Sequence, residues 1–424
     1  MATEAELTEA RKAHALPATR RRIGNAAMDT LSYEQAVMIL NGMNWRPRPV
    51  FQGYAAYSPR LIEMNAAALT GTSAPRFLLT KLQSIDGRLA MSNDPLAALI
   101  ALGQYRPVLV ERDFILQERA QRPLATEPWN GRLLVEQQVA AGEWLEVPAS
   151  SRAPLLATVE LAPSVIGRLR TLLWRGVPAF LEVEAYGAAP RKFRIVPAMV
   201  AEPFLLSPLL RSHDDLLDWY LGGTTQRVKR LRVVVKPRHR AAFSERITFR
   251  LLEQPELEGI GRDPAWRLPW PPAFTRADAI EGRHGLHWRF LDNHAVLSAH
   301  APSVMHYALA AGVYKIAIAF GMFQGSYRQG DTNGVVFTLD VEESGISRHL
   351  FRRHLDPLNN EADRGTQHAE LVVQLGGPAR LVVATQVGPR DDARWDWAYW
   401  AGIEIAGGDA APPADRVQPE EPSP

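Results

Sequence analysis

Hydrophobic and polar positions follow two different patterns along this chain. In residues 23–122, apolar positions group into helix-length segments separated by short apolar runs. From residue 123 onward, short apolar runs recur between turn residues, which is typical of the strands of sandwiches and barrels. These runs lie at 155–161, 179–185, 193–196, 231–235 and 247–252. The sequence therefore predicts a mostly β, α+β protein, with a small α/β N-terminal unit followed by two β-sandwich-type domains.

Helix signals stand at three places. Residues 58–71 begin with Ser-Pro and residues 94–103 begin with Asp-Pro, and both segments end with Gly. Each pattern predicts a capped start, proline at the first helical position and a glycine stop. A third helix is expected near 214–221, with Asp214 as its N-cap. Residues 44–57 are interrupted by prolines and predict an ordered surface loop before the first of these helices.

Strand signals cover the remaining parts. Residues 77–79 predict a buried strand, and residues 107–118 predict a hairpin. Residues 314–320 alternate large apolar residues with small or charged ones, which is the period of a strand. Residues 371–375 and 381–384 flank a Gly-Gly-Pro segment and predict a second hairpin.

These patterns predict six segments along the chain. They are a basic linker at 1–22, a small α/β domain at 23–122, a β-rich domain at 123–255, a proline-rich linker or strapped loop at 256–285, a β-sandwich at 286–406 and a disordered tail at 407–424. The basic linker is either an arm for a membrane surface or a solvated helix.

Composition narrows the function by exclusion. The net charge is only +2 over 424 residues, which gives no overall polycation for nucleic acid. The chain has no cysteine, so disulfides, zinc–thiolate sites and cysteine nucleophiles are excluded. Residues 1–10 lack a signal-peptide pattern, and no apolar run approaches the ~20 residues of a membrane helix. We expect no export signal in this chain, and a position on the periplasmic side of the inner membrane if it belongs to a longer one.

Common catalytic signatures are missing from the sequence. It has no nucleophile elbow, no phosphate-binding or dinucleotide-binding glycine loop and no HExxH motif. Five histidines lie within 284–306, and His284 and His287 have the spacing of metal ligands, but residues three apart on a strand point to opposite faces. Adjacent carboxylates at 214–215 and 391–392 do not face one point. The residues favour a binding protein over an enzyme, without excluding catalysis.

One loop is rich in side chains that ligate hard cations. Asp356, Asn359, Asn360 and Asp363 lie within 355–365. Calcium prefers about six to eight oxygen ligands, so these four residues are candidate Ca²⁺ ligands. The alternative is an Asx-rich turn whose side chains satisfy its own backbone. No other cofactor is expected.

The most distinctive local segment is aromatic. Four aromatic residues fall within 395–400, and flat amphipathic rings beside charged groups suit a sugar. Core packing is the alternative. In an extended strand Trp395 and Trp397 share one face, so Trp400 is the expected exposed ring if those two point inward. The candidate ligand-binding residues are Arg394, Trp395, Asp396, Trp397, Tyr399 and Trp400.

The C-terminal residues resemble a known family. Residues 312–314, 321–323, 331–337 and 395–400 look like strands of the NPCBM and galactose-binding-like carbohydrate-binding sandwiches, which have a Gly-Val-x-Phe strand and a closing acidic-Trp strand. The resemblance covers about 286–406, and the long 355–365 insert departs from the family pattern. It implies a galactose-binding-like β-sandwich that binds carbohydrate.

The first part of the chain has a separate resemblance. Residues 41–59 read NGMNWRPRPVFQGYAAYSP, and further motifs lie at 29–33, 65, 74–75, 85–88 and 105–108. Together they resemble the soluble C-terminal region of multi-spanning bacterial membrane proteins of unknown function. In that family a bundle of membrane helices precedes this region, and some members look like lipid-linked sugar transferases. The resemblance implies a membrane-embedded partner or an upstream membrane domain.

Three functional hypotheses follow, and the third assumes neither a ligand nor a reaction. The first is a non-catalytic, extracytoplasmic carbohydrate-binding region whose partner is a cell-surface glycan or polysaccharide. The second is the soluble part of a membrane glycosyltransferase that uses a lipid-linked sugar. In that case a phosphate- or sugar-facing surface would be lined by Arg46, Arg48, Gln52, Tyr54 and Tyr57. The third is a scaffold whose sandwiches only pack against partners.

Overall fold

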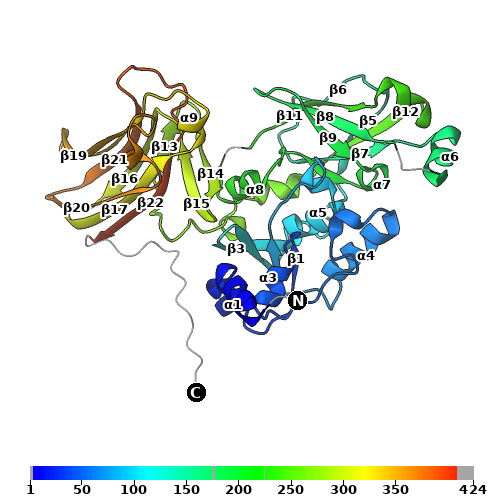
Figure 1. Ribbon diagram of the computed structural model, residues 1–424, viewed down its shortest axis with the longest axis horizontal. Coiled ribbons are helices and arrows are strands. Elements are labelled where there is room, and N and C mark those ends of the chain that lie inside the picture. The colour runs from blue at the N-terminus through cyan, green and yellow to red at the C-terminus, as the bar shows by residue number, and fades with distance from the viewer. Residues whose placement is uncertain (1–2, 174–176, 224, 408–424) are drawn as a thin grey trace. The chain divides into compact units, whose positions relative to one another are not determined.

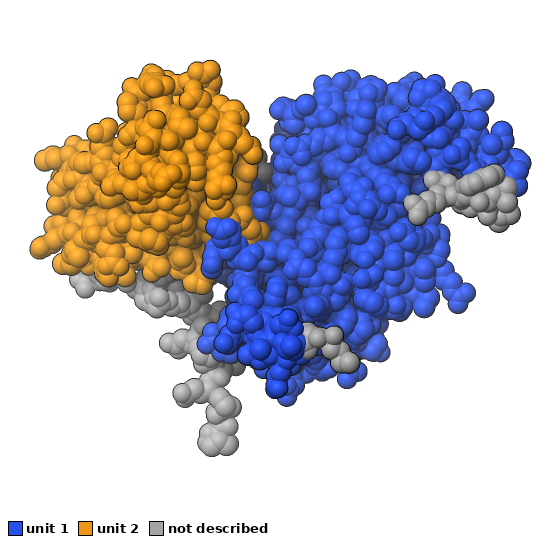
Figure 2. Space-filling model, viewed as in Figure 1, with its two compact units in different colours: residues 1–269, 292–294 blue, residues 270–291, 295–424 orange. Residues whose placement is uncertain are grey.

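The computed structural model describes residues 3–173, 177–223 and 225–407, and its commonest regular structure is the strand (Figure 1). These residues form two compact units (Figure 2). Unit 1 runs to Pro269 and takes in Asp292–His294, and unit 2 holds the rest. The prediction of a mostly β protein is confirmed. Residues 408–424 of the expected tail lie outside the described residues.

The N-terminal part of unit 1 is a four-stranded sheet with helices on both faces. Its strand order is β1-β2-β4-β3, with β1 and β2 parallel and the other neighbours antiparallel. Leu78 packs with α4 and α5 on one face, and Phe77 and Leu79 pack with α2 and α3 on the other. The strands are β1 (Met28–Leu31), β2 (Phe77–Thr80), β3 (Tyr105–Glu111) and β4 (Phe114–Arg119). The helices are α1 (Glu4–Ala13), α2 (Pro17–Ile23), α3 (Ala36–Leu40), η1 (Gly53–Ala55), α4 (Pro59–Thr70), η2 (Ala90–Ser92) and α5 (Pro95–Gln104).

The two predicted helices of this part begin where the sequence places them. The Ser58 hydroxyl accepts a hydrogen bond from the Leu61 amide at the start of α4. Helix α5 begins at Pro95, but the Asp94 side chain makes no capping bond to it. The predicted stop at Gly103 is also wrong, because α5 runs to Gln104 and β3 follows at once.

The third predicted helix is present with a different cap. Helix α8 (His213–Tyr220) starts after Ser212, whose hydroxyl accepts a hydrogen bond from the Asp215 amide. The Asp215 carboxylate in turn accepts one from the Ser212 amide, at 3.0 Å. The expectation that Asp214 is the N-cap is therefore wrong, because Ser212 and Asp215 form a reciprocal capping box.

The rest of unit 1 is a β-sandwich. One sheet has the order β10-β7-β12-β5 and the other has the order β6-β11-β8-β9. Val159 and Phe249 of the first sheet and Leu181 and Leu231 of the second share one buried core. The strands are β5 (Arg132–Ala140), β6 (Leu145–Glu146), β7 (Leu155–Glu160), β8 (Ala179–Ala185), β9 (Arg191–Ile195), β10 (Phe204–Ser207), β11 (Val228–Val234) and β12 (Arg246–Glu253). The other helices of this unit are α6 (Val165–Leu173), α7 (Pro197–Val200), η3 (Pro237–Ala242), η4 (Pro255–Gly259) and η5 (Pro264–Trp266).

The α/β part and this sandwich share buried contacts. Met199 of α7 belongs to the same apolar cluster as Leu78 and Ile100. The buried Gln117 side chain of β4 donates a hydrogen bond to the Tyr220 hydroxyl of α8, at 2.9 Å. The predicted domain boundary at 122/123 therefore falls inside one compact unit.

Unit 2 is a second β-sandwich, made of two five-stranded sheets. Their orders are β13-β16-β21-β18-β19 and β14-β15-β22-β17-β20. Phe320 of one sheet meets Phe337 of the other with ring centroids 4.7 Å apart, which places an aromatic core between the sheets. The strands are β13 (Ala279–Gly282), β14 (Leu286–Leu291), β15 (His294–Ala299), β16 (Ser303–Leu309), β17 (Gly312–Met322), β18 (Val335–Glu343), β19 (Ile346–Leu355), β20 (Gln367–Leu375), β21 (Ala379–Val387) and β22 (Ala398–Gly407). The short helices are α9 (Gly325–Arg328) and η6 (Glu361–Asp363).

One expectation about this part is wrong. The Gly-Gly-Pro segment at 376–378 is not a hairpin, because β20 pairs with β17 whereas β21 pairs with β16 and β18 in the other sheet. The chain crosses between the sheets there, and the Glu343 carboxylate accepts hydrogen bonds from the amides of Gly376 and Gly377.

The segment at 256–285, expected to be a linker or a strapped loop, is the second of these. Its last part belongs to unit 2, where it supplies the edge strand β13. Residues 273–275 run beside β22: the Ile403 amide donates to Ala273 O, and the Thr275 amide donates to Ile403 O. The Phe274 ring packs on Trp288, with centroids 4.8 Å apart. Residues 273–275 therefore form a strap beside β22 rather than a free connection.

No helix within the described residues combines the length and the apolar character needed to cross a bilayer.

Candidate functional site

The predicted aromatic segment is a turn followed by a strand. Trp395 has φ +63°, and β22 begins only at Ala398. The Asp396 carboxylate is fully buried and accepts a hydrogen bond from the Thr332 hydroxyl at 2.9 Å. Burial raises the pKa of Asp396 to about 6, against the opposing effect of that hydrogen bond. The buried Asp396 side chain therefore holds the turn to the interior of unit 2.

Two indole rings lie side by side on this turn. The rings of Trp395 and Trp397 have centroids 4.9 Å apart, and Trp397 is 40% exposed while Trp395 is half-buried. Gly330 lies against Trp395 so closely that a Cβ there would come within 2.3 Å of the ring. The Phe323 amide and the Ser326 hydroxyl donate hydrogen bonds to Trp397 O. We call these rings the Trp395–Trp397 pair; the loop between β17 and β18 holds it.

The other predicted ligand residues have different environments. Trp400 is 0% exposed and packs on Phe320 and Phe337 between the two sheets. Tyr399 is buried, and its hydroxyl hydrogen-bonds with that of Thr366 at 3.0 Å. The expectation that Trp400 is the exposed ring is wrong, because the turn at 394–397 breaks the alternation on which it depends.

Arg394 stays at the surface beside the indoles. Its guanidinium pairs with the Asp392 carboxylate at 2.8 Å, and this pairing lowers the pKa of Asp392. The pair is exposed, so a ligand can reach both charges. Of the six candidate residues, the structure brings only Arg394, Trp395 and Trp397 together at the surface.

The candidate calcium residues make hydrogen bonds within their own loop. The Asp356 carboxylate accepts hydrogen bonds from the Asn359 amide and side chain, and Asn360 caps the Ala362 amide. Asp363 accepts from the Asp356 amide at 2.9 Å and pairs with Arg353 at 2.7 Å. These contacts are those of an Asx-rich turn, and Ca²⁺ binding by this loop stays a prediction.

The clustered histidines make separate contacts. The His284 and His300 rings touch, with centroids 4.4 Å apart, while His306 approaches Glu281. Burial and then the nearby His284 lower the pKa of His300. Across the described ranges, no group of three or more His, Asp or Glu side chains is placed to hold a metal ion.

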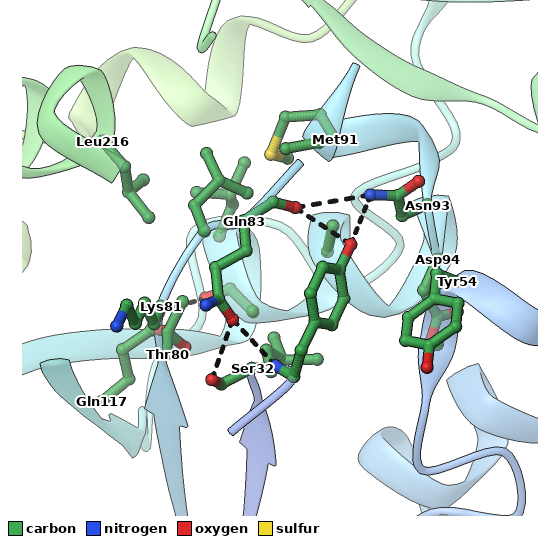
Figure 3. Close-up of a pocket in the computed structure, with 18 of the residues that line it drawn as sticks. Ser32, Tyr54, Thr80, Lys81, Gln83, Met91, Asn93, Asp94, Gln117 and Leu216 are labelled. Carbon is green, nitrogen blue, oxygen red and sulfur yellow. Dashed lines mark hydrogen bonds between the residues drawn. The ribbon is translucent and has the colours of Figure 1, made fainter. Parts of the chain in front are cut away.

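Unit 1 contains a cavity that the sequence patterns did not single out. It lies where the parallel strands β1 and β2 end, next to the start of α5 and to α8, with about 620 Å³ of free space, part of it open to solvent (Figure 3). Its apolar wall includes Leu31, Leu82, Met91, Leu102 and Leu216. Its polar wall includes Ser32, Tyr33, Arg48, Tyr54, Thr80, Lys81, Gln83, Asn93, Asp94 and Gln117.

A buried ion cluster forms one side of the cavity. The Arg48 guanidinium contacts the Asp29 carboxylate at 3.0 Å and the Asp94 carboxylate at 3.1 Å. Arg48 also donates to Thr30 O at 2.7 Å, and Asn65 donates to Asp94 Oδ2 at 2.8 Å. All of these side chains are buried. With both carboxylates ionised, the Asp29–Arg48–Asp94 cluster carries one net negative charge.

Two oxygen atoms of the cavity wall lack partners. Asp94 Oδ1 and Asn93 Oδ1 are buried and accept no hydrogen bond from any described residue. Burial raises the pKa of Asp94 to about 6, although Arg48 and Asn65 favour the ionised carboxylate. A buried acceptor without a donor costs about 1–3 kcal/mol, so this wall has unused capacity to accept hydrogen bonds.

A polar frame holds the neighbouring side chains. The Ser32 hydroxyl bonds to Gln83 Oε1 at 3.0 Å, and the Asn93 amide approaches Gln83 O, as Figure 3 shows. The Tyr33 hydroxyl donates to Gln83 O and accepts from Asn93 at 2.7 Å. These bonds fix the segment after β2 against the start of α5, and so fix the shape of the cavity.

The predicted sugar-facing surface of this unit is only partly assembled. Arg48 and Tyr54 line the cavity, whereas Arg46, Gln52 and Tyr57 do not. The sequence offered one signal for the cavity, the Asp-Pro pair at 94–95. The sequence pattern predicts from it only an N-cap for α5. Only the missing capping bond shows that the Asp94 carboxylate serves another purpose.

Comparisons with known proteins leave the family open. No protein-family model matches the chain. An uncharacterized protein of Archaeoglobus fulgidus is 30% identical over 75 residues, which is 17% of this chain and 19% of that protein. The chain thus matches about a fifth of the length of that curated relative.

Several solved carbohydrate-binding modules show a distant structural likeness. A CBM51 module with INT domains from Clostridium perfringens ZmpB is 14% identical and covers 31% of this chain and 30% of its own, with a TM-score of 0.22. The CBM6 of a laminarinase from Zobellia galactanivorans is 13% identical and covers 30% and 91%, with a TM-score of 0.20. The CBM22-1 xylan-binding domain from Paenibacillus barcinonensis is 11% identical and covers 32% and 86%, with a TM-score of 0.21. Scores this low carry no conclusion about fold or ligand.

Proposed function

We propose that unit 2 is a carbohydrate-binding module and that the Trp395–Trp397 pair is its binding surface. The observation that carries this proposal is a pair of adjacent indole rings, one exposed and one half-buried, on a turn that is otherwise tightly anchored. Sugar rings present apolar C–H faces, and an aromatic face fixed in advance binds them with a smaller loss of conformational entropy.

The charged neighbours fit the same ligand. The exposed ion pair of Arg394 and Asp392 supplies donors and acceptors at the edge of the indole surface. Sugar hydroxyls need such groups, and a few well-placed polar side chains determine which sugar is bound. The buried anchor Asp396 keeps the turn in place but does not reach the ligand.

A glycan array probed with the full chain tests this proposal. We expect binding to one group of related glycans, and loss of that binding in Trp397→Ala. The matched control is Tyr186→Ala, which removes another exposed aromatic ring in unit 1. Full glycan binding by Trp397→Ala, or no bound glycan on the array, would overturn the proposal.

We further propose that the ligand is a cell-surface glycan and that the chain acts on the extracytoplasmic side. The support is the resemblance of the N-terminal residues to soluble regions that follow membrane helices. Fusion of a topology reporter to the protein in its native gene context tests this, and a cytoplasmic signal would refute it.

A second candidate function concerns unit 1. We propose that its cavity binds a hydroxyl-bearing small molecule, such as the acceptor of a sugar transfer. Asp94 Oδ1 and Asn93 Oδ1 accept no hydrogen bond from the described residues and could accept one from a ligand hydroxyl. A phosphate is disfavoured, since Arg48 is already engaged by Asp29 and Asp94. A thermal-shift screen of simple sugars and polyols against wild type and Asn93→Leu tests it. Identical shifts in both proteins would exclude the cavity.

A further inference from the structure

Helix α6 of unit 1 presents an uncovered apolar face. Val165, Ile166 and Leu169 are 82%, 63% and 59% exposed. At roughly 100° per residue, these three side chains fall within about a quarter to a third of the helix circumference. Figure 1 shows α6 at the outer edge of unit 1. Isolated exposed apolar residues are ordinary, but three on one short helix face form a patch that requires explanation.

The opposite face of α6 is firmly seated. Gly167 lies against Ala242, so that a Cβ on Gly167 would come within 1.9 Å of Ala242 O. The Ser164 amide donates to Ala242 O, and the Ser164 hydroxyl donates to Ala241 O. Helix α6 is therefore fixed on η3, and its apolar face points outward because of that attachment.

Cations surround the apolar face. Arg168 and Arg170 flank it on α6 itself, at helix angles on either side of the three apolar residues. Three more exposed cations, Lys236, Arg238 and Arg240, lie on or just before η3. In the described part of the chain, none of the five forms an ion pair with a carboxylate, whereas Arg230, Arg232 and Arg250 on strands of the same unit do.

The titration of His239 reports the same positive field. Burial, followed by the charges of Arg238, Arg170 and Lys236, lowers the pKa of this histidine. Arg170 of α6 and two cations at η3 thus act on one point, so the two elements share a positive field. A partner that carries negative charge would complement this field.

We propose that α6 and η3 form a docking surface for an anionic lipid bilayer. The three apolar side chains enter the boundary between headgroups and acyl chains, and the five cations face the lipid phosphates. Helices with an apolar stripe between basic residues bind such surfaces in this orientation. The partner is thus a membrane that supplies both an apolar layer and negative charge.

Two other partners fit less well. A second copy of this chain would bring five cations against five, and this repulsion opposes association. A nucleic acid would satisfy the cations, but phosphates and base edges offer little to Val165, Ile166 and Leu169. Of these three partners, the bilayer alone offers both an apolar layer and negative charge to the α6–η3 surface.

Sedimentation of the full chain with vesicles tests the proposal. We expect binding to mixed phosphatidylcholine and phosphatidylglycerol vesicles, none to phosphatidylcholine alone, and weaker binding as salt rises. Ile166→Ser with Leu169→Ser should weaken binding about tenfold or more. Arg168→Gln with Arg170→Gln should weaken it about fivefold per cation.

Matched variants keep the result specific. Ile346→Ser with Val372→Ser removes two equally exposed apolar side chains in unit 2, and Arg276→Gln with Arg283→Gln removes two exposed cations there. Both controls should bind vesicles like wild type, and all variants should keep the wild-type melting temperature because every altered side chain is exposed.

Three results would overturn the proposal. The first is vesicle binding that is unchanged in the α6 variants. The second is a dimer in sedimentation velocity that Ile166→Ser with Leu169→Ser converts to a monomer, which would make the surface a self-interface. The third is tight binding of a DNA or RNA duplex that depends on the arginines but not on Ile166 and Leu169.

Discussion

Trp397 and Trp400 lie three positions apart and have opposite environments. Trp400 fills the space between the sheets of unit 2, while Trp397 lies on the anchored turn at the surface. Residue type alone does not separate them, because tryptophan serves both as core and as ligand surface.

Alanine variants of these two residues should therefore behave differently. Trp400→Ala leaves a large cavity and should lower the free energy of unfolding of unit 2 by about 3–5 kcal/mol. Trp397→Ala should leave the melting temperature nearly unchanged while abolishing glycan binding. Calorimetry and glycan binding on both variants check this. A large stability loss in Trp397→Ala would mean that this ring is core.

Arg48 offers a test at the same scale. Replacing it by Met leaves the buried carboxylates of Asp29 and Asp94 without their cation, which should cost unit 1 about 3–5 kcal/mol near neutral pH. Burial already holds the pKa of Asp94 above its unfolded value, and loss of Arg48 raises it further. The folded state then binds its proton more tightly than the unfolded state, so stability falls as pH rises through the folded pKa.

The expected signature is a variant that is more destabilised at about pH 8 than at about pH 5, measured by urea unfolding. The control is Arg76→Met, which removes an exposed partner of Glu118 and should cost less than about 1 kcal/mol at either pH. An Arg48 variant with equal losses at both pH values would show that the Asp94 carboxyl does not change its protonation.

At the scale of elements, two helices carry a reciprocal capping box with different consequences. Ser212 caps α8, which buries Leu216, Leu217 and Tyr220 in unit 1. Thr3 caps α1, which buries no side chain. The same capping box thus supports a helix that packs in the core of unit 1 in one case, and a helix without buried side chains in the other.

Ser212→Ala should lower the stability of unit 1 by about 1 kcal/mol, because α8 cannot fray without exposing its buried face. Thr3→Ala should leave the unfolding midpoint in place and reduce only the helical signal of the native protein. Urea unfolding followed by circular dichroism distinguishes the two. An equal shift of the midpoint in both variants would contradict this account.

At the scale of the whole molecule, the start of unit 2 at Trp270 determines which fragment we expect to fold by itself. The strap at 273–275 and the edge strand β13 lie before residue 286, where the sequence pattern placed the start of the sandwich. A fragment that starts at 286 exposes Trp288 and leaves β16 without its outer neighbour.

A fragment of residues 270–407 should unfold cooperatively with a β-type circular dichroism spectrum. A fragment of residues 286–407 should be less stable, because it lacks those pairings, and should aggregate through its open sheet edge. Thermal unfolding and light scattering compare the two. Equal stability would show that the strap and β13 contribute nothing to the fold.

The sequence by itself determined the local features whose causes lie within a few residues. The start of α4 after Ser58, the strand at 77–79 and the period-two strand at 314–320 follow from capping, burial and alternation, and all three are present. The mostly β class follows from the same signals summed along the chain.

The tertiary structure alone decided which of these elements meet. The Gly-Gly-Pro segment crosses between sheets, because strand pairing depends on partners far along the chain. Asp94 serves Arg48 and Asn65 rather than its own helix, and the turn at 394–397 leaves Trp397 exposed and Trp400 buried. Pairing, burial and charge contacts arise between residues distant in sequence, so local patterns predict the elements while the packed core determines their roles.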